Sequence, residues 1–274
     1  MSVRILGEFM QPLLGQSIVV DNRPGGLFQV GMQALGSAPP DGYTLIHLNT
    51  TMGAIQASYK RFDLLKQLTP VGVIGTTIAV LCLANNAPFK TLPEMAAWAK
   101  ANPGRLTYGS LGPGSMEHLA MVTLLGRAGA SGTNVPFKGG PDGALALAQG
   151  EIHAMPLPMP LVLQFKDKFR PAATLVEQRN PLLPDVPTAR EQGLDIPPVQ
   201  YWGGLAAPAG TPRASVEALE KALASAVNNP ALRQRYMPLG LDPLSGDSQA
   251  LTRMIEADLR WFGDAVRAAN LNLS

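Results

Sequence analysis

Residues 106–118 read LTYGSLGPGSMEH, a short strand pattern that breaks into a glycine-rich loop and then reopens as a helix. Leu119, Val122 and Leu125 follow with the approximate spacing of one helical face. Open α/β sheets bind ligands in loops of this kind, where a strand ends and a helix begins. The stretch therefore predicts an α/β fold with a ligand loop at this position.

The same loop has the features of an anion-binding site. Its glycines let the backbone approach a ligand closely, and the unpaired N–H groups of a helix start favour negative charge. A plain strand-to-helix turn fits the same residues. The candidate ligand contacts in the loop are Ser110, Gly112, Gly114 and Ser115.

The missing features of the loop limit the type of anion. It does not end in Gly-Lys-Ser/Thr as a nucleotide P-loop does, and Pro113 interrupts the dinucleotide pattern G-x-G-x-x-G. We therefore expect a small anion such as a carboxylate.

Composition excludes several other classes of protein. The chain has 274 residues and a net charge of +2, so it is long enough for two lobes and offers no strongly basic field for nucleic acid. The longest mostly apolar run, residues 71–84, is too short to span a bilayer. The single cysteine, Cys82, lies in a buried-strand pattern, and the three histidines have no metal spacing. We expect no metal, no cofactor and no catalytic residue.

The first part of the chain reads as alternating helices and strands. Helices are predicted over residues 2–14 and 27–37, and strands over residues 17–20 and 43–48. The second strand ends in Asn49, Thr50 and Thr51, at the kind of edge where α/β sheets bind ligands. Thr50 or Thr51 fits equally well as the cap of the next helix.

A second glycine turn follows a strand predicted at residues 133–136. Lys138, Gly139 and Gly140 lead into a helix start, and the glycine N–H groups are better candidates for an anion than the Lys138 side chain, which solvent can hold. Further along, Trp202 fits either a ligand contact or a packing residue, and we favour contact.

Local signals also set several helix ends. Thr91 and Glu94 form a predicted capping box, and Thr211 with Pro212 is predicted to begin a later helix. A short helix is also predicted over residues 188–192. His118, in the first turns after the glycine loop, fits a structural role better than a direct contact.

Six motifs, in this order and spacing, resemble those of the Bug family, the periplasmic solute receptors of tripartite tricarboxylate transporters. They lie at residues 20–25, 40–45, 108–118, 135–140, 183–188 and 205–212. The similarity covers essentially the whole chain.

The resemblance implies a type II periplasmic-binding-protein fold, in which two α/β domains joined by two crossover segments hold a ligand in a cleft. Domain 1 is expected at residues 1–80 plus 204–274 and domain 2 at residues 81–203. The implied function is a receptor that passes a small carboxylate ligand to the membrane permease subunits of the transporter. The alternatives are a type II-lobe enzyme acting on a small organic acid, or a ligand sensor in signalling.

The chain departs from the family pattern at two places. Similar proteins usually carry Asp at the position of His153 and a Phe-Asp-Asn-like run at residues 156–158, where this chain has Pro, Leu and Pro. Leu157 and Pro158 would make that cleft wall apolar, which suits a ligand with a hydrophobic or aromatic body.

The second departure is at the start of the chain. Similar proteins carry a strand and a Pro-Gly-Gly loop before the helix that begins here at Ser2. We expect that strand and a signal peptide upstream of Met1, and thus a periplasmic location. An oligomer is expected if another chain supplies the missing strand.

Overall fold

The computed structural model describes residues 2–23 and 25–268. It divides into two compact units, Met1–Thr76 with Trp202–Gly263 (unit 1) and Thr77–Tyr201 with Asp264–Ser274 (unit 2). The chain passes from one unit to the other inside the strands β2 (Leu68–Ala84) and β7 (Gln200–Pro208), and again inside the helix α11 (Ser248–Ala268). The functional domains at residues 1–80 plus 204–274 and 81–203 stay a prediction.

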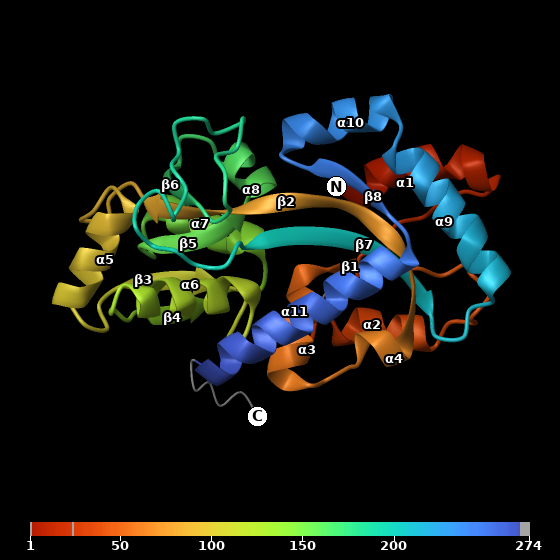
Figure 1. Ribbon diagram of the computed structural model, residues 1–274, viewed down its shortest axis with the longest axis horizontal. Helices are drawn as coiled ribbons and strands as arrows, with labels where there is room; N and C mark the ends of the chain where they lie inside the picture. Colours follow the sequence, from red (N-terminus) through yellow and green to blue (C-terminus); the bar gives the residue numbers. More distant parts are fainter. Residues whose placement is uncertain (1, 24, 269–274) are drawn as a thin grey trace. The chain divides into compact units, whose positions relative to one another are not determined.

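Unit 1 is built on a sheet in the order β1-β7-β2, and β8 also pairs with β2. β1 (Ile46–Asn49) runs antiparallel to β7, and β8 (Asp242–Gly246) runs antiparallel to β2. In Figure 1, β2 and β7 can be followed side by side. Because β1 ends at Asn49, the sheet delivers the predicted polar cluster directly to the start of a helix.

Helices cover this sheet with two apolar clusters. One cluster joins α1 (Ser2–Leu14), α9 (Arg213–Val227) and α10 (Pro230–Tyr236), and the Tyr236 hydroxyl donates to the carbonyl of Ser2 at 2.8 Å. The other joins α2 (Gln29–Gly36), α3 (Thr50–Tyr59), α4 (Leu64–Gln67) and α11 (Ser248–Ala268). A single 3₁₀ turn, η1 (Met237–Leu239), follows α10.

Two predicted elements near the sheet are wrong. Residues 17–20 form no strand: Val19 is 88% exposed, and the Ile18 N–H donates to the Gln11 side chain at 2.9 Å instead of to a neighbouring strand. An apolar run becomes a strand only where a partner strand is available, and β1 pairs only with β7 among the described residues. In unit 2, residues 188–192 form no helix: Thr188 makes an isolated β-bridge with Thr174, and residues 189–192 form turns.

Unit 2 contains a sheet in the order β2-β5-β3-β4, with β6 (Phe169–Thr174) also paired to β2. β3 (Thr107–Ser110) runs parallel to both β4 (Thr133–Pro136) and β5 (Ala154–Pro158). The helices of this unit are α5 (Leu92–Ala101), α6 (Met116–Arg127), α7 (Gly140–Gln149) and α8 (Met159–Gln164). Cys82 lies fully buried in its core, and burial raises the pKa of its thiol.

The start of α5 confirms the predicted N-cap at Thr91, whereas the return hydrogen bond of the Glu94 side chain goes to the residue before the cap. Thr91 Oγ1 accepts from the Glu94 N–H at 3.3 Å, and Glu94 Oε2 accepts from the Lys90 N–H at 2.7 Å. The cap predicted at Thr211 is wrong, because its hydroxyl donates to the Pro208 carbonyl at 2.8 Å and α9 has no side-chain cap.

Replacing Thr91 with alanine is expected to lower the free energy of unfolding by about 1 kcal/mol, because one helix N–H loses its acceptor. Urea denaturation measures this loss. Thr91→Ser keeps the hydroxyl and is the matched control. Equal destabilisation by both variants would show that the cap contributes nothing.

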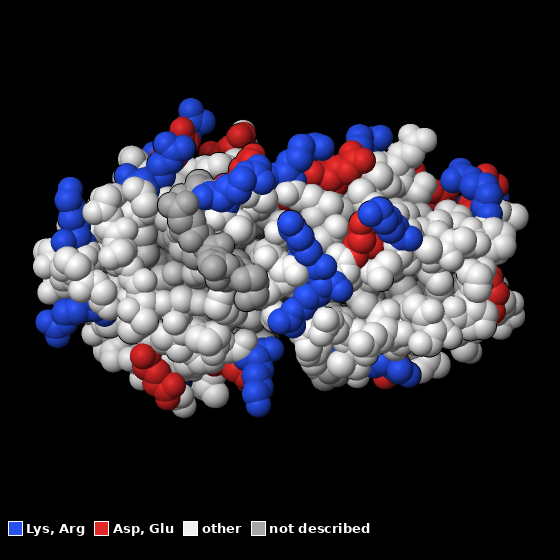
Figure 2. Space-filling view, turned by 90° about the horizontal axis from the view of Figure 1, so that it is seen from below, with Lys and Arg blue, Asp and Glu red and all other residues white. Residues whose placement is uncertain are grey.

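No helix of the described part of the chain is long and apolar enough to cross a membrane. The face shown in Figure 2 carries lysine and arginine in small groups, with acidic residues beside some of them. This distribution agrees with the small net charge of +2.

Candidate functional site

In unit 2, three neighbouring parallel strands end at one edge of the sheet. Ser110, the last residue of β3, pairs with Pro136, the last residue of β4, and the Phe137 N–H donates to the Ser110 carbonyl at 2.8 Å. β5 lies on the other side of β3 in parallel register, so its last residue, Pro158, is at the same edge. The structure therefore brings together both predicted glycine turns and the end of β5.

The glycine loop is held by its own hydrogen bonds. The Gly112 N–H donates to Ser110 Oγ at 3.0 Å, and the Ser110 hydroxyl donates to the Gly112 carbonyl at 3.2 Å. Gly112 and Gly114 have φ angles of 117° and 74°, which L side chains rarely adopt. Ser115 is the N-cap of α6, and its Oγ accepts from the His118 N–H at 3.4 Å.

His118 is part of this loop scaffold. Its Nδ1 accepts from the Gly114 N–H at 2.9 Å, and its ring stacks on Tyr108 with the ring centroids 6.1 Å apart. Burial lowers the pKa of His118, so the imidazole is neutral at neutral pH. Both contacts hold the loop in place, as expected for a structural role of His118.

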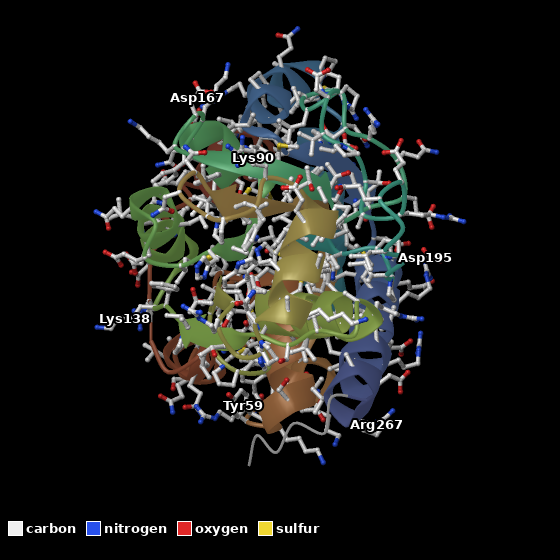
Figure 3. The ribbon with its side chains drawn as sticks, turned by 90° about the vertical axis from the view of Figure 1, so that its left-hand side faces the viewer. Tyr59, Lys90, Lys138, Asp167, Asp195 and Arg267 are labelled. Carbon is white, nitrogen blue, oxygen red and sulfur yellow. The ribbon has the colours of Figure 1, made fainter. Side chains whose placement is uncertain are left out.

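The second turn is more open. Gly139 is the N-cap of α7 in an extended conformation, and no side chain caps this helix. Gly139 and Gly140 are partly exposed, and Lys138 is exposed, with its side chain directed away from the ribbon in Figure 3. The first N–H groups of α7 therefore have no side-chain acceptor as a cap. N–H groups of this kind at a helix start favour the binding of an anion.

The residues that depart from the family pattern occupy two different ends of β5. Leu157 is 0% exposed and lies in the core of unit 2, so it forms no surface there, whereas Pro158 is partly exposed. His153 precedes β5 at the opposite end, where its Nδ1 accepts from the Thr107 N–H at 3.1 Å. Within unit 2, only Pro158 of these residues lies beside the glycine turns.

In unit 1, the polar cluster after β1 forms the start of α3. Asn49, and neither threonine, is the cap: its side chain accepts from the Met52 N–H at 3.3 Å. Thr50 Oγ1 accepts from the backbone N–H of Trp202 at 2.8 Å, and Thr50 and Thr51 are both buried. This cluster therefore fixes β7 against α3.

Trp202 is only 5% exposed and belongs to the core of unit 1. Its Nε1–H donates to Asp258 Oδ2 at 2.7 Å. Burial raises the pKa of Asp258 to about 7, while the hydrogen bond from Trp202 opposes this rise. The ligand contact predicted for Trp202 stays a prediction, and in this structure its backbone N–H donates to Thr50 while its ring nitrogen donates to Asp258.

The sequence interpretation missed one buried carboxyl beside the glycine loop. Glu117 is 3% exposed, and its Oε1 accepts from the Tyr201 hydroxyl at 3.0 Å, although the two residues are 84 positions apart. An acidic residue in the first turn of a helix is an ordinary dipole-compensating choice, so the sequence carries no signal of its burial.

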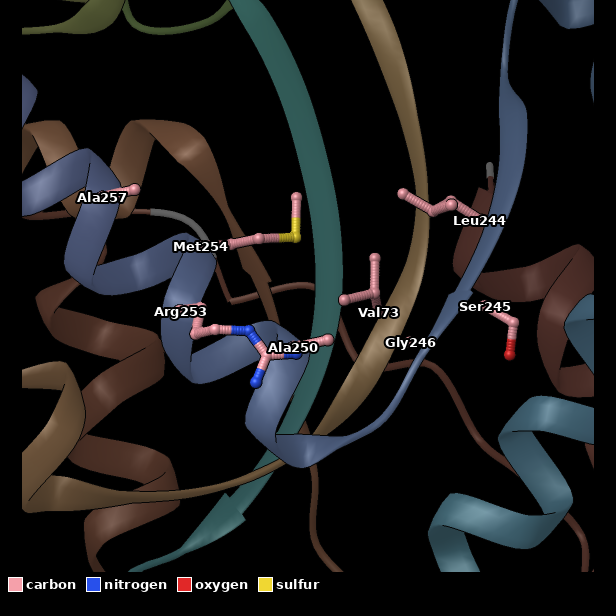
Figure 4. Close-up of a pocket in the computed structure, with 8 residues that line it drawn as sticks. All are labelled: Val73, Leu244, Ser245, Gly246, Ala250, Arg253, Met254 and Ala257. Atoms are coloured by element: carbon pink, nitrogen blue, oxygen red, sulfur yellow. The ribbon is translucent and has the colours of Figure 1, made fainter.

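Two pockets of the described residues lie elsewhere in unit 1. Figure 4 shows one of about 380 Å³, lined by residues of β2, β8 and α11 that include Val73, Leu244, Arg253 and Met254. Its neighbour, of about 610 Å³, is lined by Glu217, Glu220 and Lys221 among others. Neither contains a predicted ligand contact. Among residues 2–23 and 25–268, no three His, Cys, Asp or Glu side chains gather as a metal site.

Comparison with known proteins adds an independent line of evidence. The family model described as "Tripartite tricarboxylate transporter family receptor" matches residues 2–271. A protein of Cupriavidus necator named "UPF0065 protein in gbd 5'region" is 33% identical over 252 residues, which cover 90% of this chain and 76% of that protein.

Solved structures agree in fold. A Rhodopseudomonas palustris protein with adipate has a TM-score of 0.90 and 27% identity, covering 98% of this chain and 92% of that one. MatC from the same organism, with bound malate, has a TM-score of 0.89 and 27% identity, covering 97% of this chain and 93% of that one. These findings confirm the predicted resemblance and the type II periplasmic-binding-protein fold. Because the family match spans nearly all of the sequence, this chain belongs to the solute receptors of the tripartite tricarboxylate transporter family.

Proposed function

We propose that this receptor captures a small carboxylate-containing ligand and delivers it to the membrane permease subunits of a tripartite transporter. The observation that carries the proposal is the edge of unit 2, where the Ser110–Ser115 loop and the Gly139–Gly140 turn leave adjacent parallel strands and lead into helix starts. Such helix starts donate N–H groups to a carboxylate or to another hydrogen-bond acceptor. Relatives of the same fold are solved with adipate and with malate.

Unit 2 supplies the glycine turns of the proposed site. The Gly139 and Gly140 turn offers the more open backbone N–H groups, while Ser110, Gly112, Gly114 and Ser115 form a loop held by its own hydrogen bonds. In unit 1, Asn49, Thr50 and Thr51 begin α3 and stay predicted ligand contacts.

We further propose that the receptor works in the periplasm and makes or breaks no covalent bond in its ligand. A receptor is stabilised by its ligand and releases it unchanged, whereas an enzyme consumes it. Incubation with malate and with adipate, followed by chromatography of the recovered acid, separates the two. Disappearance of either acid would favour the alternative of a type II-lobe enzyme.

The direct test uses thermal unfolding with a panel of mono-, di- and aromatic carboxylates. A ligand at 100 times its Kd stabilises the folded protein by about 2.7 kcal/mol, which a thermal shift detects easily. The panel also tests the preference for an apolar body expected from Leu157 and Pro158. Equal affinity for short dicarboxylates and aromatic carboxylates would contradict that preference.

Gly139→Asp is expected to weaken carboxylate binding about tenfold or more, because it places a negative charge at the start of α7. The variant is expected to fold, because aspartate is a good N-cap residue and Gly139 has an extended backbone. The atom nearest to an added Cβ at this position is 3.7 Å away. Gly139→Asn is the matched control, which adds the same cap without the charge. Calorimetry that gives both variants the same affinity would contradict the assignment of this turn.

A further inference from the structure

Glu117 is an unusual residue to find at a loop proposed to bind anions. It is 3% exposed in the first turn of α6, two residues after the N-cap Ser115. Its Oε1 accepts from the Tyr201 hydroxyl at 3.0 Å, and its Oε2 is buried as well. No lysine or arginine of the described chain forms an ion pair with it.

Burying a carboxyl in this position lowers the free energy of unfolding relative to an apolar side chain of similar size. Burial without a cation raises the pKa of Glu117, and hydrogen bonds from its own backbone, Tyr201, Ser115 and the Leu111 backbone oppose that rise. The opposing donors belong to the glycine loop and to the crossover strand, so the carboxyl sits directly against the loop. It therefore titrates next to the place where a ligand carboxylate would bind.

The other titratable groups around Glu117 do not neutralise it. α6 packs on β3 and β5. β3 contributes Tyr108, and β5 contributes no titratable side chain. His118 follows on the same helix as a buried imidazole whose pKa is lowered, and Tyr201 is a phenol whose pKa burial and Glu117 raise. Cys82, near Tyr201, is a buried thiol whose pKa is also raised. All of these groups are neutral at neutral pH.

We propose that Glu117 makes this receptor discriminate against a second carboxylate at the Ser110–Ser115 loop, so that its ligand carries one carboxylate and, at its other end, a neutral polar group such as an amide or hydroxyl. This inference rests on the proposed function and narrows its ligand class. Two negative charges a few ångströms apart repel strongly where water is largely excluded, whereas a neutral amide or hydroxyl avoids that repulsion. The carboxylate of the ligand is then left to the Gly139–Gly140 turn, where no side chain caps the helix and the acidic residue of the first turn, Asp142, is exposed to solvent instead of buried.

The test compares two ligands of equal length, adipate and its monoamide, adipamate, by calorimetry at a series of pH values. We expect the wild type to bind adipamate about tenfold more tightly than adipate at the highest pH, and the preference to shrink as the pH falls and Glu117 takes up a proton. In Glu117→Gln the preference should fall to within about twofold and lose its pH dependence. Protonation of adipate itself affects the wild type and Glu117→Gln equally, so the difference between the two proteins reports on Glu117 alone. Glu151→Gln, on the exposed surface, is the matched control and should behave as the wild type.

A second variant keeps the carboxyl and changes only its donor. Tyr201→Phe removes the hydroxyl that stabilises ionised Glu117, so the pH at which the preference appears should move upward. An unchanged preference in Glu117→Gln, or an unchanged midpoint in Tyr201→Phe, would overturn the inference while leaving the receptor function intact. A folded wild type that binds neither adipate nor adipamate, nor any acid of the thermal panel, would overturn the proposed function and this inference with it.

Discussion

Asp258→Asn is expected to raise the free energy of unfolding by up to about 4 kcal/mol at pH 8, because it removes a partly buried charge from unit 1. Burial raises the pKa of Asp258 from 3.8 to about 7 in the folded protein. The folded state therefore binds this proton more tightly than the unfolded state does. The stabilisation is complete below about pH 4 and is lost as the pH rises to about 7.

The amide of asparagine stays neutral at every pH and still accepts from the Trp202 Nε1–H, which lies 2.7 Å from Asp258 Oδ2. The difference between variant and wild type should thus be small near pH 4 and largest above pH 7. Urea denaturation at a series of pH values measures it. Glu256→Gln, exposed on the same helix, is the control. A difference that stays constant across the pH series would show that Asp258 does not titrate in this range.

Gly75→Ala is expected to destabilise the protein by about 3 kcal/mol, because β2 and β8 are too close at this point to admit a Cβ. An added Cβ would lie 2.6 Å from the carbonyl oxygen of Asp242 and 3.3 Å from the Cα of Pro243. Both neighbours are backbone atoms of β8, so no side-chain rotation relieves the clash. The pairing of β2 with β8 has to shift.

Gly126→Ala makes the same chemical change where nothing lies within 4 Å of the added Cβ. Because Gly126 is inside α6, alanine there should stabilise the protein by about 0.5–1 kcal/mol. Denaturation of both variants gives the comparison. If Gly75→Ala were as stable as the wild type, the close approach of β2 and β8 would not be a requirement of the fold.

The sequence predicted those features that neighbouring residues create by themselves. The N-cap at Thr91 and the glycine loop that leads from β3 into α6 depend on contacts within a few positions. The amphipathic helix over residues 2–14 is found at the same bounds as α1. Two predictions failed because the local signal had no partner in the fold. Residues 17–20 have the composition of a strand but do not pair with one. The Thr211 hydroxyl donates to the Pro208 carbonyl instead of accepting from an N–H of the helix.

For the candidate site, order along the chain was enough to select the loops but not to assign their side chains. The six spaced motifs led to the receptor family, which the family match confirms. Leu157, expected on a cleft wall, is buried in the core of unit 2, because alternation along β5 turns it toward the neighbouring strands and helices. Whether the predicted ligand contacts bind a carboxylate stays a prediction for the experiments above.

By itself, the sequence determined the class of fold, the family and the two glycine turns, since these follow from short-range spacing and from motifs in a fixed order. The tertiary structure alone decided which carboxyls are buried. Glu117 meets Tyr201 from 84 positions away, and Asp258 meets Trp202 from 56 positions away. The physical reason is that the cost of burying a carboxyl depends on the surrounding solvent and donors, and these are set only when distant segments pack together.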